Sequence, residues 1–198
     1  MNQETKQALA QSLRGFHLPR YHEIPNVGLY LEQVTKYIGE YLAPLGQSGL
    51  TSYMISNYVK KGLVASPVKK QYDRELIAHL LFIALAKNVM SLDDLQKYIE
   101  LQQRTYAVGV AYDYFCDEFE ALLGYVFHPS EETVSVPPMN NDEKTILRNI
   151  VITIAHKIYL EKYIAAVTEE LLNAPQVEEG LHPSSFLWKK AEEIPPFQ

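Results

Sequence analysis

Residues 51–74 read TSYMISNYVKKGLVASPVKKQYDR and combine a short helix signal with a basic segment around a proline. Thr51 and Ser52 are both residue types that cap helices, and the apolar residues that follow recur at helical spacing. Gly62 marks the end of this helix, because glycine adopts the left-handed conformation at little cost. The stretch therefore predicts an amphipathic helix over residues 51–61 whose outer face is polar and basic, with no acid.

The segment after Gly62 is compatible with a β ribbon. Pro67 has no N–H to donate, so we expect an edge ribbon or an extended loop rather than a central strand. Residues 51–74 hold one acid, Asp73, and five cations: Lys60, Lys61, Lys69, Lys70 and Arg74. A polar helix followed by a basic wing is typical of a DNA-reading unit, because cations neutralise phosphates while Ser, Asn and Tyr side chains reach base edges.

Three parts of the chain also carry a resemblance to a known family. They are ISNYVKKGLV at 55–64, the basic turn that ends at Tyr72, and MSLDDL at 90–95. These segments resemble the winged helix-turn-helix of MerR-type transcriptional regulators, over residues 27–103. The resemblance implies a recognition helix, a wing with basic and tyrosine residues, and binding to double-stranded DNA as a homodimer.

The chain departs from the MerR pattern at two positions. The family places Arg-Tyr-Tyr-Glu on the recognition helix where this chain has SNYV at 56–59, so only Tyr58 carries over, and Lys70 stands where an arginine is usual. A closer overall resemblance is to an uncharacterised bacterial domain family (DUF1836-like). That resemblance rests on LPRY at 18–21, ISNYVKKGL at 55–63 and KKQY at 69–72, and the family has no assigned function.

The pattern and the MerR resemblance together give a set of candidate DNA-binding residues. They are Ser52, Tyr53, Ser56, Asn57, Tyr58, Lys60, Lys61, Lys69, Lys70 and Tyr72. We therefore expect a sequence-specific transcriptional regulator. The alternative is a protein-interaction adaptor that keeps the winged fold without binding DNA, which the missing arginine at Ser56 would permit.

The net charge of −6 is divided unevenly along the chain. Residues 1–75 hold nine Lys/Arg and six Asp/Glu, a net charge of +3, whereas residues 76–198 hold nine and eighteen, a net charge of −9. This division fits a DNA reader joined to an acidic body that faces away from phosphate, or a solvated surface with chance asymmetry. The sequence has one cysteine, Cys116, and lacks a signal peptide or a long apolar run, so we expect a cytoplasmic protein.

Helical periodicity extends over most of the chain, so the predicted class is all-α with at most a short β wing. We divide it into an N-terminal arm (1–26), a winged helix-turn-helix domain (27–103) and an all-helical region (104–198). Helices are expected over residues 1–15, 27–42, 73–87, 105–127 and 142–172, with another that begins at Ser91. In the arm, Arg20 is either a phosphate contact or a solvated residue of a packed segment.

The all-helical region offers a dimer contact and a pocket as hypotheses. The helix over 142–172 is apolar over most of its circumference, so a second subunit is expected to cover part of it or of the 105–127 helix. Aromatic residues in the region indicate either core packing or a pocket for a small-molecule effector: Tyr106, Tyr112, Tyr114, Phe115, Tyr159 and Tyr163.

Catalytic motifs are missing from the order of residues. There is no Gly-rich phosphate loop, no paired histidines at metal-ligand spacing, and no serine or cysteine in a nucleophile context. Cys116 has no basic neighbour in sequence to lower its pKa, so it is interpreted as a small core residue. The expectation is a protein that is not an enzyme and that carries no metal or cofactor.

Overall fold

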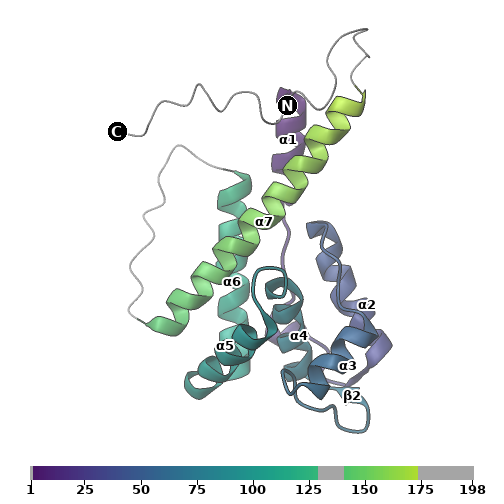
Figure 1. Cartoon of the computed structure of the whole chain (residues 1–198), viewed down its shortest axis with the longest axis vertical. Helices are drawn as coiled ribbons and strands as arrows, with labels where there is room; N and C mark the ends of the chain where they lie inside the picture. The colour runs from purple at the N-terminus through teal and green to yellow at the C-terminus, as the bar shows by residue number, and fades with distance from the viewer. Residues whose placement is uncertain (1, 129–140, 174–198) are drawn as a thin grey trace.

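The structure is a computed structural model that describes residues 2–128 and 141–173. In chain order its elements are α1 (Gln3–Gln11), η1 (Tyr21–Glu23), β1 (Leu29–Tyr30), α2 (Leu31–Leu42), η2 (Ala43–Leu45), α3 (Ser52–Lys60), β2 (Gln71–Tyr72), α4 (Arg74–Ala86), α5 (Leu92–Thr105), α6 (Val108–Phe127) and α7 (Asp142–Asn173). The predominance of helix, with one small sheet, confirms the predicted class (Figure 1).

Helix starts follow the capping residues in the sequence. The side chains of Thr51, Asp73 and Ser91 accept hydrogen bonds from backbone N–H groups in the first turns of α3, α4 and α5. Each cap satisfies one of the N–H groups that lack a partner at a helix N-terminus. At the other end of α3, Gly62 has φ +77°, as the sequence predicts.

The small sheet joins segments that are far apart in sequence. β1 pairs antiparallel with β2, with Leu29 opposite Tyr72 and Tyr30 opposite Gln71. The helix expected from Val27 therefore begins only at Leu31, because the preceding residues form a turn and a strand. Val27, the first residue of the expected helix, is 81% exposed.

A second boundary also differs from the expectation. Thr105 was expected to open the long second-half helix, but it ends α5, and α6 begins at Val108. Tyr106 and Ala107 between them have extended backbone, which breaks the helical path. The expected helix over 142–172 is confirmed as α7.

The hydrophobic core is centred on α4. Its residues from Leu76 to Ala86 are buried except for His79, which is partly buried. Phe82 of α4 packs edge-on against Phe115 of α6 and contacts Tyr98 of α5. The core is thus continuous from the winged segment into the later helices.

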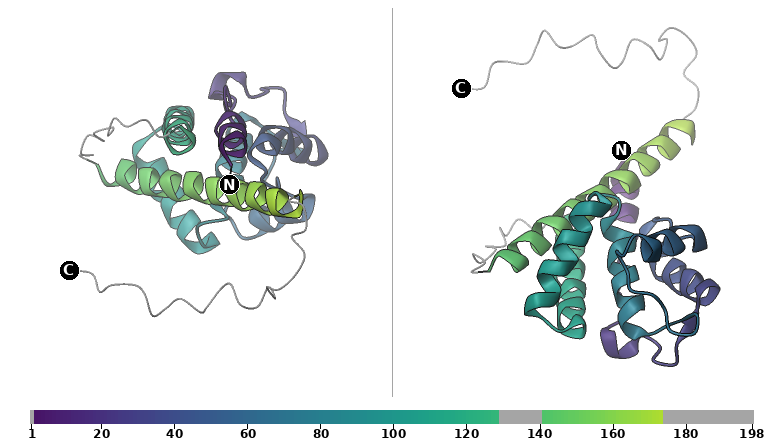
Figure 2. Two further views of the ribbon diagram at one scale, coloured as in Figure 1. Left: turned by 90° about the horizontal axis from the view of Figure 1, so that it is seen from above. Right: turned by 60° about the horizontal axis from the view of Figure 1, so that its bottom comes forward.

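The long helix α7 organises the remaining elements (Figure 2). It packs along α6, and α1 lies against its C-terminal half, where the backbone N–H of Asn2 donates to both carboxylate oxygens of Glu170. α3 and β2 lie at the opposite end of the molecule from α1 (Figure 1). None of the helices in the two described ranges is both long and apolar enough to cross a lipid bilayer.

Candidate nucleic-acid interface

The first part of the candidate interface is α3, a helix of nine residues. Ile55 and Tyr58 are buried and fix the helix against the core, where α3 contacts α2. The outward residues follow at helical spacing: Tyr53 is 81% exposed, and Ser56 and Lys60 are exposed as well. At 1.5 Å per residue the helix is about 13 Å long, a size that a DNA major groove admits.

Polar groups on this face remain available for a partner. The Asn57 side chain is half-buried and makes no hydrogen bond among the described residues. The Ser56 hydroxyl donates to the Ser52 carbonyl at 2.8 Å, which uses its proton and leaves its lone pairs free to accept. This face of α3 therefore presents the Asn57 amide, which can both donate and accept hydrogen bonds, and the Ser56 hydroxyl, which can accept them.

The second part is a tight turn at the tip of the wing. The Gln71 N–H donates to the Val68 carbonyl at 2.9 Å, and both central residues have positive φ, 51° at Lys69 and 65° at Lys70. Positive φ at both positions defines a type I′ turn, which favours Asn-Gly. Each lysine in this conformation costs about 1 kcal/mol or more. The turn therefore holds two cations in a strained geometry at its tip.

The base of the wing is fixed by close packing. Tyr72 is 5% exposed and lies opposite Leu29 in the sheet. A Cβ at Gly28 would lie 3.1 Å from the Gln71 Cβ, and Gly28 has φ +70°. Both constraints favour glycine there, so the strand before α2 approaches the wing closely.

Four lysines of the interface have no counter-charge in the described part of the chain. Lys60, Lys61, Lys69 and Lys70 are exposed, and none of them makes an ion pair or a side-chain hydrogen bond with a described residue. The helix end and the wing turn thus place unneutralised positive charge on one end of the molecule. Such a surface attracts phosphate.

Two predicted contact residues do not belong to this surface. Tyr58 is 3% exposed and Tyr72 is 5% exposed, so both side chains pack in the core, and burial raises the pKa of each phenol. Their assignment as DNA contacts is corrected to a structural role. The other eight predicted residues lie on α3, at its C-terminal end or on the wing turn.

Arg74 was counted in the basic charge of this stretch, and the structure gives it another role. Its Nε donates to the Ile24 carbonyl at 2.8 Å, an Nη donates to the His22 carbonyl at 3.1 Å, and the guanidinium lies over the Tyr21 ring. Arg74 therefore holds the N-terminal arm and is not part of the candidate interface.

The sequence missed Tyr30 and Gln71. Tyr30 falls within the helix expected over residues 27–42, but it lies in a strand, is 55% exposed and pairs with Gln71 beside the wing turn. A run of Val-Gly-Leu-Tyr before a capped helix is the only local signal for the strand, and two residues of strand are too short for periodicity to reveal. Both side chains border the lysine-bearing turn.

The connection between α2 and α3 is anchored from two directions. Lys87 Nζ donates to the Gly49 carbonyl at 3.0 Å, and burial lowers the pKa of Lys87. Gln47 donates to Glu161 of α7 at 2.7 Å and accepts from Asn88 at 3.1 Å. These contacts fix the orientation of α3 relative to α4 and α7.

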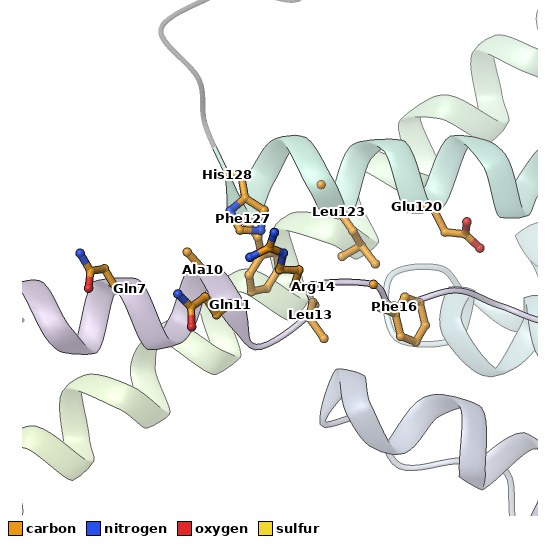
Figure 3. Close-up of a pocket in the computed structure, with 12 residues that line it drawn as sticks. Gln7, Ala10, Gln11, Leu13, Arg14, Phe16, Glu120, Leu123, Phe127 and His128 are labelled. Atoms are coloured by element: carbon orange, nitrogen blue, oxygen red, sulfur yellow. The ribbon is translucent and has the colours of Figure 1, made fainter.

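Groups suited to other chemistry lie elsewhere. Cys116 is fully buried, and burial raises the pKa of its thiol to about 12, which confirms the core interpretation. Within residues 2–128 and 141–173, no three His, Cys, Asp or Glu side chains gather in a way that could hold a metal. A hollow of about 600 Å³ lies between the C-terminal end of α1, with the residues that follow it, and the C-terminal end of α6. In this hollow the Arg14 side chain lies toward Phe127 and His128 (Figure 3).

The described residues form a predominantly helical fold with a small two-stranded sheet at one end. Residues 19–115 match the model of a family described as a domain of unknown function, DUF1836. The match includes α3, the wing and α4, and therefore every residue of the candidate interface. No curated protein and no solved structure matches the chain.

Proposed function

We propose that this protein is a sequence-specific DNA-binding transcriptional regulator that acts as a homodimer, with α3 and the wing turn as its DNA-contacting elements. The observation that supports the proposal is a set of four exposed lysines on adjoining elements, none of which forms an ion pair within the described part of the chain. The MerR-like segments at 55–64 and 90–95 support it by resemblance.

In this proposal the two elements have different tasks. α3 enters the major groove, where Asn57 and Ser56 contact base edges and determine specificity. Lys60, Lys61 and the lysines of the wing turn contact phosphates and determine affinity and its dependence on salt.

The proposed dimer uses the C-terminal half of α7. Leu160 is 56% exposed, Ile164 is 54% exposed and Leu171 is 72% exposed, and the partly buried Val167 lies between the last two. Their spacing of four, three and four residues forms one apolar stripe typical of a helix pair. The C-terminal end of α7 lies beside α1, at the opposite end of the molecule from α3 (Figure 1), so pairing there leaves both DNA-contacting faces open.

The test is DNA binding by fluorescence anisotropy, with fragments from upstream of the protein's own gene and a scrambled duplex at two salt concentrations. We expect tighter binding to one upstream fragment than to the scrambled duplex. K60A/K61A and K69A/K70A should each weaken binding to every duplex by about tenfold and flatten the salt slope by about two, one per lost phosphate contact.

Two controls separate contact from folding. Lys162→Ala removes a lysine of α7, away from the interface, and should leave affinity and salt slope unchanged. Asn57→Ala should reduce the preference for the upstream fragment more than the affinity for the scrambled duplex. Equal binding of the wild type to all duplexes at low salt, with no effect of the lysine pairs, rejects the proposal.

A protein-interaction adaptor is the second candidate function. Exposed apolar side chains at the same end of the molecule favour it: Val27 and Tyr53 are each 81% exposed and Val68 is 72% exposed. Such residues suit a protein partner better than phosphate. Under this alternative, Tyr53→Ala abolishes function in cells while K60A/K61A and K69A/K70A do not.

A further inference from the structure

A small cavity of about 100 Å³ lies between α5, α6 and α7. It shares Tyr98, Gln102, Ala111 and Leu147 with an adjoining space of about 30 Å³ that reaches α4. Cavities of about 150 Å³ with apolar walls take up a molecule of benzene size. The two spaces together therefore suit one ring-sized compound rather than a large ligand.

Tyr98 contributes a hydroxyl group to the lining of this cavity. Its side chain is 7% exposed, and the hydroxyl makes no hydrogen bond among the described residues. Burial raises the pKa of Tyr98, and Glu143 and Tyr114, which line the same cavity, raise it further. The hydroxyl can therefore donate a hydrogen bond to a ligand acceptor.

Lys144 adds a positive charge at the same cavity. Its Nζ lies 4.9 Å from the centroid of the Tyr114 ring and makes no ion pair with a described residue. Glu143 supplies the one carboxylate among the lining residues, and its Oε1 accepts from the Thr105 hydroxyl at 2.8 Å. Tyr98, Lys144 and the Gln102 amide thus offer donors.

We propose that this cavity binds a ring-sized aromatic carboxylate. The ring packs against Ala111 and Leu147, and the carboxylate accepts hydrogen bonds from the Tyr98 hydroxyl and the Lys144 ammonium group. Charge-assisted bonds of this kind are about twice as strong as neutral ones, so a carboxylate is favoured over a neutral compound of the same shape.

This binding does not depend on the proposed DNA function. The adjoining space is lined by His79 and Phe82 of α4, the helix that directly follows the wing, so any influence of the ligand on DNA affinity would pass through α4. That influence rests on the proposed function, and the binding is therefore tested without DNA.

The test compares benzoate with benzamide, its neutral counterpart of the same shape, by ligand-observed NMR and calorimetry on the full chain. We expect saturable binding of benzoate that is at least about tenfold tighter than that of benzamide. Lys144→Gln should remove this difference, and Ala111→Leu should abolish binding because the leucine fills the cavity. Tyr125→Phe changes an exposed tyrosine of α6 outside the cavity and should bind like the wild type.

Tyr98→Phe distinguishes ligand binding from a structural role. Removal of a hydroxyl that makes no hydrogen bond among the described residues should leave the melting temperature of the free protein unchanged or raised, while the affinity for benzoate falls. Absence of saturable benzoate binding, or benzoate binding by a folded Ala111→Leu variant at wild-type affinity, overturns the proposal. Should Ala111→Leu fail to fold, unchanged benzoate affinity in both Lys144→Gln and Tyr98→Phe overturns it as well.

Discussion

Two sets of cations in this protein differ in their contacts, although the sequence does not distinguish them. Two arginines are engaged: Arg20 of the arm donates to both oxygens of Glu120 at 2.8 Å and lies 3.0 Å from Asp117, and Arg148 of α7 pairs with Glu118. The lysines at the end of α3 and on the wing turn have no such partners among residues 2–128 and 141–173. Paired arginines thus stabilise the fold, while unpaired lysines are left for a ligand.

Chemistry explains why the two groups differ in residue type. A guanidinium is planar and pairs with a carboxylate through two parallel bonds, whereas an ammonium group is a strongly hydrated point charge. Arg20 follows the first pattern: Glu120 also accepts from the Leu18 N–H at 2.8 Å, so one carboxylate holds both the arm backbone and the arm side chain. The arm is therefore packed at Arg20, whose guanidinium is paired and partly buried.

The largest effect on this comparison is expected from Arg20→Ala. The change leaves Glu120 without its partner in a site where the two side chains are 20–28% exposed. We expect the free energy of unfolding to fall by about 2–3 kcal/mol, between the values for exposed and for fully buried pairs. Urea unfolding measures it, with Lys60→Ala as a control that should lie within about 0.5 kcal/mol of the wild type. An equal loss of unfolding free energy in Arg20→Ala and Lys60→Ala would contradict the difference between the paired arginine and the exposed lysine.

A smaller effect of opposite sign is expected at the wing turn. Replacing Lys69 by Asn and Lys70 by Gly installs the pair that a type I′ turn favours, because both positions have positive φ. The free energy of unfolding should rise by about 1 kcal/mol while affinity for DNA falls. Loss of stability in this double variant would contradict the turn geometry, and retained DNA affinity would contradict the role of the lysines.

The smallest expected effect concerns how the free energy of unfolding depends on pH under acidic conditions. Hydrogen bonds from Arg148 hold the pKa of Glu118 below its ordinary value of 4.5. A carboxyl with a lowered pKa in the folded state contributes stability that is present above its unfolded pKa and is lost as the pH falls through the folded pKa. We therefore expect unfolding free energies below pH 4.5 to decline less steeply in Glu118→Gln than in the wild type. Lys60→Ala should leave that slope unchanged.

Much of the local structure could be predicted from the sequence. The caps at Thr51 and Ser91, the helix end at Gly62 and the buried helix over 73–87 all depend on residues within a few positions of each other. The position of α3 and the two lysine pairs was predicted on the same basis. Missed features involve partners distant in sequence, such as Tyr30 opposite Gln71.

The sequence by itself thus determined the helical class, the capped helix α3 and the two lysine pairs, because periodicity, capping and charge are properties of neighbouring residues. Only the tertiary structure decided which cations stay free, since Arg20 and Arg74 find partners 100 and 50 residues away. It also decided that Tyr58 and Tyr72 are buried and that Tyr98 lines a cavity. Burial and pairing are set by contacts between elements, which the order of residues does not specify.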